Sequence, residues 1–342
     1  MKPFALLALL LPLLALTASE PAPATIIIAN AKPIENAWVE RETLEGVFFF
    51  LGDPKSDKKI AGTRKRGQYE RVIYSGEGDD PNYLRALALL RDGKADAADF
   101  FKKATGTAKW QWVVEDCYVR AASGYAHTKK GDDALAVLTE YVSKFPQSVR
   151  MAEVVQLRAG LLLAKGDKAA AAKDYAEMEK QGPAWGPGTW LTGVIGQREV
   201  LVADKQFTEA VDFLTARWIK VKPETETEAF AEIGIAIADD LKAAGKIEDS
   251  AVALKKLYLA PLTTEAQAKA RLRHARILAE ANDTKGNLAA FDQAAIAALL
   301  GADDDTQNAA VKLVRELAVR LDKDKTVPEA DRVLYRKYPS GL

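Results

Sequence analysis

The stretch from Met151 to Gln181 constrains the fold of this chain more than any other. In its second half, Ala171, Tyr175 and Met178 fall at positions i, i+4 and i+7, which places them on one face of a helix. The first half carries a similar apolar stripe. Gly166 and the aspartate that follows it separate the two halves, and these residue types suit a helix C-cap and a helix N-cap. The stretch therefore predicts two amphipathic helices joined by a tight turn.

A single hairpin of this size cannot bury its own apolar face, so the pattern is expected to recur. The turn glycines Gly93, Gly131 and Gly166 do follow one another at about one repeat length. The same spacing of core residues recurs in Ala97, Phe101 and Ala104, in Ala134, Leu138 and Tyr141, in Ser250, Leu254 and Leu257, and in Asn287, Phe291 and Ala294. The chain is therefore predicted to be mainly α, with an α-solenoid of about seven helical hairpins over residues 82–342.

These hairpins resemble the tetratricopeptide repeat. That repeat has a small residue late in its first helix, a glycine before the turn, an alanine early in the second helix and an aromatic residue four positions later. Ala159, Gly166, Ala171 and Tyr175 follow this scheme. A second unit follows it with Gly124, Gly131, Ala134 and Pro146. The resemblance covers roughly residues 82–300 and implies a concave groove that binds a peptide or protein partner, with no catalytic role.

The N-terminus has the three-part layout of a secretory signal peptide, predicted over residues 1–19. Lys2 gives a positive start, and the run from Phe4 to Leu16 is apolar but short for a membrane span. The residues after this run are small, so cleavage is expected near Ala18 or Ser19. The protein is therefore predicted to be periplasmic or secreted, with no membrane span after cleavage. A retained membrane anchor is the alternative.

Residues 24–75 have a different pattern, with short β-branched and aromatic runs between turn residues. The runs Ile26–Ile28, Val47–Leu51 and Val72–Tyr74 predict strands of a small β roll or barrel, similar to an SH3 fold. Every residue from Val47 to Leu51 is apolar, so both faces of that strand should be covered. We expect one face to pack inside the roll and the other against the first helical repeat.

The sequence offers few residues for catalysis, and neither an enzyme nor a cofactor is predicted. It has only two histidines, which fall in different repeats, and Cys117 is a single cysteine. No spacing typical of a metal site or a nucleotide-binding loop is present. The formal charge is +0, with 48 basic and 48 acidic residues, which argues against nucleic acid as a partner.

A basic cluster stands out within the predicted β roll. It consists of Lys55, Lys58, Lys59, Arg64, Lys65 and Arg66. Such a cluster suits an acidic polymer, so binding or processing of an envelope polymer by this β domain is the alternative function. A solvated hairpin loop is the simpler interpretation, because nearby aspartates dilute the charge.

The main prediction is a non-catalytic scaffold in the cell envelope that binds its partner in the groove of the solenoid. The resemblance points to groove positions on the first helix of successive repeats. These are Tyr118, Tyr125 and Lys129, then Glu153 and Gln156, then Glu199, and finally Asp239 and Lys242. Two tyrosines among mixed charges favour an extended peptide held by polar contacts and aromatic anchors. The alternative is that these residues are merely solvated.

Overall fold

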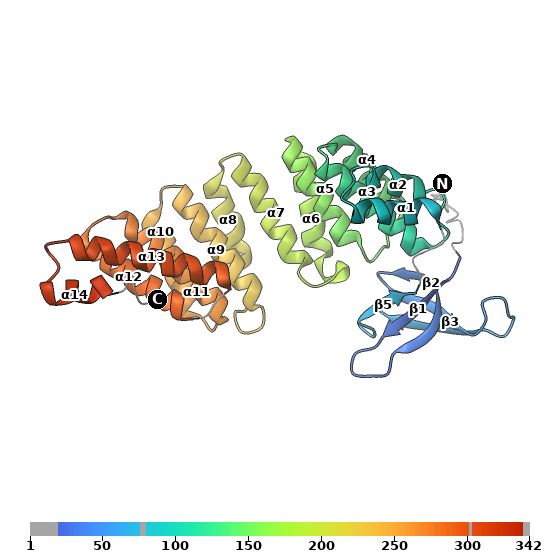
Figure 1. Ribbon diagram of the computed structural model, residues 1–342, viewed down its shortest axis with the longest axis horizontal. Helices are drawn as coiled ribbons and strands as arrows, with labels where there is room; N and C mark the ends of the chain where they lie inside the picture. Colours follow the sequence, from blue (N-terminus) through green and yellow to red (C-terminus); the bar gives the residue numbers. More distant parts are fainter. Residues whose placement is uncertain (1–19, 76–79, 301–302, 338–342) are drawn as a thin grey trace, which may run out of the picture. The chain divides into compact units, whose positions relative to one another are not determined.

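The computed structural model describes residues 20–75, 80–300 and 303–337, in which five strands precede fourteen helices (Figure 1). The predicted signal peptide lies outside the described residues. The chain forms two compact units, Met1–Trp190 and Leu191–Leu342, and each is described by itself below. That residues 24–75 and residues 82–342 are separate domains stays a prediction.

The strands of the first unit form one antiparallel sheet in the order β4-β3-β2-β1-β5. The strands are β1 Ala22–Ile27, β2 Ile34–Thr43, β3 Gly46–Leu51, β4 Ile60–Lys65 and β5 Arg71–Tyr74. The last strand returns to pair with the first, and an irregularity in β2 between Val39 and Arg41 bends the sheet. The core includes Ile26, Val39, Val47 and Phe49. This is the small β roll that the sequence predicts.

Strand β3 is covered on both faces, as its continuous apolar run predicts. Val47 and Phe49 face the core of the roll. On the opposite face, the Arg41 guanidinium lies 4.0 Å from the centroid of the Phe48 ring. The Lys59 ammonium lies 4.6 Å from the centroid of the Phe50 ring. Cationic side chains of the sheet region itself therefore cover these rings, where the sequence predicts the first helical repeat.

The helices follow one another as antiparallel pairs, which make seven hairpins within the described residues. The first unit holds α1 Pro81–Arg91, α2 Ala97–Ala104, α3 Gln111–His127, α4 Gly131–Lys144, α5 Met151–Lys165 and α6 Lys168–Trp185. The helices after these are α7 Thr189–Ala203, α8 Phe207–Trp218, α9 Thr227–Ala243, α10 Ile247–Leu259, α11 Thr264–Glu280, α12 Thr284–Leu299, α13 Asp304–Lys323 and α14 Glu329–Lys337. The mainly α, tetratricopeptide-like arrangement that the sequence predicts is confirmed.

The hairpin of α5 and α6 shows why the pattern folds in this way. Gly166 ends α5 in a left-handed conformation with φ of 89°, which glycine adopts without strain. The next residue, Asp167, caps α6 by accepting a hydrogen bond of 3.1 Å from the Ala170 N–H. Ala159 and Ala171 are fully buried, so small side chains allow the two helices to approach closely. The turn and the core residues predicted from the sequence are confirmed here.

Ion pairs also link some consecutive hairpins within each unit, between residues about one repeat apart. In the first unit, Lys165 pairs with Asp132 at 2.6 Å, 33 positions earlier. In the second unit, Arg273 pairs with Asp239 at 3.4 Å, 34 positions earlier. The periodicity of the sequence therefore appears in its charges as well as in its apolar residues.

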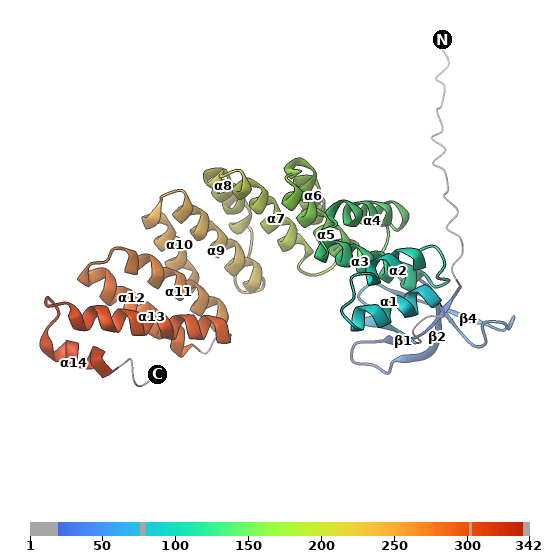
Figure 2. The same cartoon turned by 45° about the horizontal axis from the view of Figure 1, so that its top comes forward.

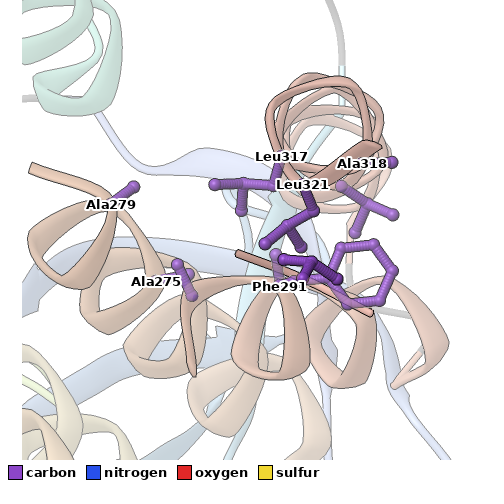
Figure 3. Close-up of a cluster of buried hydrophobic side chains, with 10 residues drawn as sticks. Ala275, Ala279, Phe291, Leu317, Ala318 and Leu321 are labelled. Atoms are coloured by element: carbon purple, nitrogen blue, oxygen red, sulfur yellow. The ribbon is translucent and has the colours of Figure 1, made fainter. Parts of the chain in front are cut away.

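The second unit contains a core of small and aliphatic side chains between α11, α12 and α13. Figure 3 shows Leu317 and Leu321 of α13 directed toward Phe291 of α12, with Ala275 and Ala279 on α11. In Figure 2 these three helices lie side by side, in agreement with the contacts between them. The final helix, α14, buries no residue, and a polar final element is typical of a helical array that must stay soluble.

Candidate functional site

The two tyrosines predicted as groove anchors lie in the interior of the first unit. Tyr118 is fully buried and Tyr125 is 8% exposed. The Tyr118 hydroxyl donates a 2.5 Å hydrogen bond to Glu140 Oε1, and the Tyr125 hydroxyl donates a 2.8 Å bond to Asp99 Oδ1. Buried rings with satisfied hydroxyl groups cannot serve as surface anchors, so this part of the site prediction is wrong. Their role is to join α3 to the neighbouring helices α4 and α2.

Tyr118 belongs to a charged cluster on α2, α3 and α4. The Lys144 ammonium donates to the Tyr118 hydroxyl at 2.9 Å and to Glu140 Oε1 at 2.7 Å, and Lys102 also pairs with Glu140. Partial burial alone would raise the pKa of the Glu140 carboxyl. Hydrogen bonds from Lys102, Lys144 and Tyr118 outweigh that effect and lower the pKa to about 2. The cluster is thus an ion-pair network that joins three helices.

The other predicted groove residues in the first unit are at the surface. Lys129 is exposed and has a left-handed backbone with φ of 61° in the turn between α3 and α4. Glu153 is exposed and pairs with Arg150 at 2.9 Å. Gln156 is exposed on the same helix, α5. Near them, a Cβ atom added at Gly160 would meet nothing within 4 Å, so this face of α5 is open.

The remaining three predicted groove residues lie in the second unit. Glu199 is exposed on α7. Asp239 of α9 is exposed and pairs with Arg273, and the neighbouring Lys242 pairs with Glu280 of α11. The structure therefore brings Asp239 and Lys242 together on one helix. These two residues tie one hairpin to the next, and any role in binding a partner stays a prediction.

The first unit contains a cavity of about 260 Å³ between the sheet and the helices, which we call the sheet–helix cavity. It is lined by Glu20, Ala22, Val39, Glu40, Arg41, Glu42, Tyr74, Tyr83, Gln111, Trp112, Glu115, Asp116, Arg120, Val149 and Arg150. Three strands and two helices contribute to it, which explains why no local sequence pattern indicated it. The nearest sequence signal was the tryptophan-rich start of α3.

Three carboxylates in the wall of this cavity are held by the protein itself. Asp116 accepts a 2.9 Å hydrogen bond from the Tyr83 hydroxyl and pairs with Arg150 at 3.2 Å. Glu42 accepts a 2.9 Å bond from the Tyr69 hydroxyl, and burial raises the pKa of its carboxyl. Glu115 accepts from Tyr141 at 2.6 Å and from Gln111 at 2.7 Å. These three carboxylates already accept hydrogen bonds from side chains of the protein itself. The cavity that they line is therefore a joint between the sheet and the helices.

Aromatic stacking closes the same joint. The Trp112 ring lies 5.2 Å from the Tyr74 ring of β5 in a stacked arrangement, and it meets Tyr83 edge-on at 6.3 Å. In addition, the Leu44 N–H at the tip of the β2–β3 turn donates a 2.9 Å hydrogen bond to the Gln147 carbonyl, between α4 and α5. Trp112 therefore packs at an interface between elements, as large aromatic side chains often do.

A second depression of about 450 Å³ lies in the first unit beside the β2–β3 turn, and we call it the turn hollow. It is lined by Leu44, Glu45, Val142, Pro146, Gln147, Met151, Val155, Arg158, Asp174, Glu177, Gln181, Ala184 and Trp185. Arg158 and Asp174 form a two-bond ion pair across it, with distances of 2.7 and 2.6 Å. With two of its charged residues paired in this way, the hollow offers apolar side chains and a mostly acidic rim.

Residues suited to catalysis are dispersed in the structure. His127 is exposed in the first unit, whereas His274 of the second unit is half-buried with its pKa lowered by burial and by Lys255 and Arg271. Burial raises the pKa of the Cys117 thiol, which makes it a poor nucleophile. Across residues 20–75, 80–300 and 303–337, no group of three or more His, Cys, Asp or Glu residues is placed to hold a metal ion. Helices long and apolar enough to cross a membrane are likewise absent from the described ranges.

Comparison with known proteins finds solved structures that resemble this chain, and two of them are described below. No family model and no curated protein matches the chain. A tetratricopeptide repeat protein from Parabacteroides merdae is 13% identical with a TM-score of 0.30, and the match covers 68% of this chain and 97% of that one. The C-terminal part of a TPR repeat-containing protein from Cytophaga hutchinsonii is 14% identical with a TM-score of 0.43, covering 71% of this chain and 97% of that one. The description as tetratricopeptide-like rests on the hairpins described above.

Proposed function

We propose that this protein is a non-catalytic scaffold of the cell envelope that holds an extended segment of a partner protein on the first helices of its hairpins. The observation that carries the proposal is the open face of α5. Glu153 and Gln156 are exposed there, and Gly160 has free space above it. An array of helical hairpins offers a long continuous surface for a peptide, and an uncovered polar face inside such an array suits that use.

Site-specific crosslinking tests this proposal directly. A photoreactive amino acid is placed at Gln156 or Gly160 of the full chain, and the matched control carries it at Lys173, an exposed residue of the second helix α6. Each protein is then exposed to native envelope extract, and crosslinked species are identified by mass spectrometry. We expect one partner to be captured from Gln156 and Gly160 but not from Lys173. Equal capture at all three positions, or capture only from Lys173, would contradict the groove.

The envelope location is a separate part of the proposal and needs its own test. It is supported by the apolar run from Phe4 to Leu16 and the small residues after it. Mass spectrometry of the protein recovered from a periplasmic or culture fraction should show a mature chain that begins near Ser19 or Glu20. A chain that still begins at Met1 in that fraction would show that the leader is retained.

A further inference from the structure

Strand β4 is an open edge of the five-stranded sheet. It stands at the end of the strand order and pairs only with β3. Its residues are exposed, except for the half-buried Gly62, and Ile60 is 70% exposed. An edge strand presents backbone donors and acceptors that a further strand can use. The opposite edge, β5, is only four residues long, and its Tyr74 is stacked on Trp112.

The register identifies which backbone groups of β4 point outward. The Arg66 N–H donates to the Glu45 carbonyl at 2.9 Å, so it points toward β3. Successive residues of an antiparallel strand direct their backbone groups to opposite sides, so Lys65, Thr63 and Ala61 point away from β3. The Lys65 N–H confirms this direction, because it donates to the Gln68 side chain at 2.9 Å. Ala61 and Thr63 therefore present two outward N–H groups and two outward carbonyls.

One of these four groups already has a hydrogen-bond partner, which is a basic side chain of β4. Arg64 Nη1 donates to the Thr63 carbonyl at 3.0 Å, an exposed contact that an incoming N–H group can replace. The remaining three groups take part in no hydrogen bond among the described residues. The edge therefore has room for a short antiparallel or parallel strand with up to four backbone hydrogen bonds.

Basic residues outnumber acidic ones at this edge, where Asp53 and Asp57 of the β3–β4 loop are the nearby aspartates. Lys58 and Lys59 precede β4, and Arg64, Lys65 and Arg66 lie at its end. Arg66 pairs with Glu42 at 3.6 Å. Among the described residues, Lys58, Arg64 and Lys65 form no ion pair. Arg64 and Lys65 are consecutive residues of β4, so their side chains extend from opposite faces of the sheet.

This combination selects the kind of strand that fits. A second copy of β4 would bring basic residues together. In an antiparallel pair centred on Gly62, Lys65 would lie opposite Lys59 of the other copy, and in a parallel pair Arg64 and Lys65 would each lie beside their own counterpart. Like charges repel across a strand pair. Lysine at a sheet edge protects against such self-association, but it attracts a strand that carries carboxylates. We propose that β4 takes up an acidic, extended segment of a partner polypeptide as a sixth strand. The backbone of this acidic segment forms hydrogen bonds with Ala61 and Thr63, and its carboxylates pair with Arg64 and Lys65.

This inference goes beyond the proposed function, because it places a second binding surface on the sheet and requires nothing of the helical groove. Strand addition supplies affinity through the main chain and specificity through side chains on either face. Each surface can therefore be tested without the other.

The test uses a fluorescein-labelled nine-residue peptide of alternating glutamate and threonine and the full chain at low salt, with binding measured by fluorescence anisotropy. A second peptide has the same sequence with every backbone nitrogen methylated, which keeps the carboxylates but leaves neither edge of the peptide with donors for β4. We expect the unmodified peptide to bind at least about tenfold more tightly than the methylated one. Equal binding of the two peptides, or no binding of the unmodified one, would overturn the proposal.

Three protein variants complete the test. Thr63→Pro removes an outward N–H, which an edge strand tolerates better than a central strand, and should weaken binding about tenfold. Arg64→Gln combined with Lys65→Gln should weaken it similarly and flatten its salt dependence. Lys32→Gln, an exposed lysine in the β1–β2 turn, should leave binding unchanged. Circular dichroism of each variant reports whether the sheet is kept, and the methylated peptide decides the question if Thr63→Pro unfolds.

Two other outcomes would each point to a different occupant. Concentration-dependent dimerisation of the wild-type chain through β4, abolished by Thr63→Pro, would show that a second copy binds there. Tighter binding of an acidic polysaccharide such as heparin than of the peptide, unaffected by Thr63→Pro, would show a charge-only surface. Either result would overturn strand addition by a partner polypeptide.

Discussion

The cores of two hairpin regions show that one repeat architecture is stabilised by two different chemistries. Between α3 and α4 of the first unit, buried Tyr118 and Tyr141 meet edge-on at 5.8 Å, and Tyr141 donates to the buried carboxylate of Glu115. Between α11, α12 and α13 of the second unit, one core cluster consists of alanine, valine, leucine and one phenylalanine. The first core depends on hydrogen bonds with fixed directions, whereas the second depends on volume and apolar area.

This difference has a physical consequence for mutation. A buried hydrogen-bond network loses several bonds at once when its central acceptor is removed, because every donor is then left unsatisfied. An aliphatic core loses only the contacts and the apolar area of the side chain that is removed. The two regions should therefore respond to different substitutions and differently to pH.

The largest effect is expected for Glu115→Ala. The change removes the shared acceptor of Tyr141, Ser148 and Gln111, so the buried Tyr141 and Ser148 hydroxyls keep only their bond to each other. It should destabilise the first unit by about 4 kcal/mol. Denaturant unfolding gives the free energy, and hydrogen exchange should show lost protection in α3 and α4 but not in α12 and α13. Glu115→Gln, which keeps an acceptor, should cost only about 1 kcal/mol. Equal costs for the two variants would break the comparison.

A slightly smaller effect is expected for Leu317→Ala in the second unit. Leu317 is fully buried in the aliphatic core, and the cavity left by its truncation should cost about 3 kcal/mol. Hydrogen exchange should report the loss in α12 and α13, with α3 and α4 unchanged. Val319→Ala on the same helix is the control, because Val319 is 42% exposed and its truncation should change stability by less than about 0.5 kcal/mol.

Tyr141→Phe isolates the hydroxyl from the ring. The ring still packs against Tyr118 and Phe145, but Glu115 loses one donor, so the expected cost is about 1.5 kcal/mol. Thermal unfolding and denaturant unfolding both measure it. A neutral result would mean that packing of the ring, and not the hydrogen bond, stabilises this core, which would make the two regions alike.

The smallest effects concern pH, and they have opposite signs for two carboxyl groups of the first unit. The pKa of Glu140 is lowered to about 2, so its stabilising contribution is present above the ordinary value of 4.5 and is lost as pH falls from there toward 2. The pKa of Glu42 is raised above 4.5 by burial, so its charged form costs stability at neutral pH, and that cost disappears as pH falls through the raised pKa.

Melting temperatures from neutral pH to about pH 3 should reveal both effects. Glu140→Gln should be less stable than the wild type at neutral pH, with a difference that shrinks in acid. Glu42→Gln should be more stable than the wild type at neutral pH, again with a difference that shrinks in acid. The aliphatic variant Leu317→Ala should show a difference that is independent of pH, and a pH-dependent one would contradict the distinction between the two cores.

The helical part of the fold could be read from the sequence because its signals are local. Gly166, Asp167 and the spacing of Ala171 and Tyr175 lie within one hairpin, and each has the role expected of it. The groove tyrosines could not be placed in this way. The Tyr118 hydroxyl bonds to Glu140, 22 positions away, and the Tyr125 hydroxyl bonds to Asp99, 26 positions away. Aligning a repeat pattern assigns each residue a position on its helix, but it carries no information about such hydrogen-bond partners on other helices.

The sheet–helix cavity was beyond the reach of sequence reasoning for the same reason. Glu42, Tyr74, Trp112 and Arg150 belong to four separate segments, and only the packing of β2 and β5 near α3 brings them together. The basic cluster, by contrast, was visible as a run of charges. Its position along an unpaired strand edge depends on the strand order, which the sequence did not reveal.

The ion pairs between consecutive hairpins have a consequence for how such a chain can change during evolution or design. Lys165 is matched to Asp132 in the first unit, and Lys242 to Glu280 in the second, so the hairpins that hold these residues carry charges suited to one particular neighbour. Deleting, duplicating or exchanging a hairpin would place unmatched charges at the new junction even where the apolar core still fits. The hairpins joined by these ion pairs are therefore not interchangeable modules, because their surface charges fit one order along the chain.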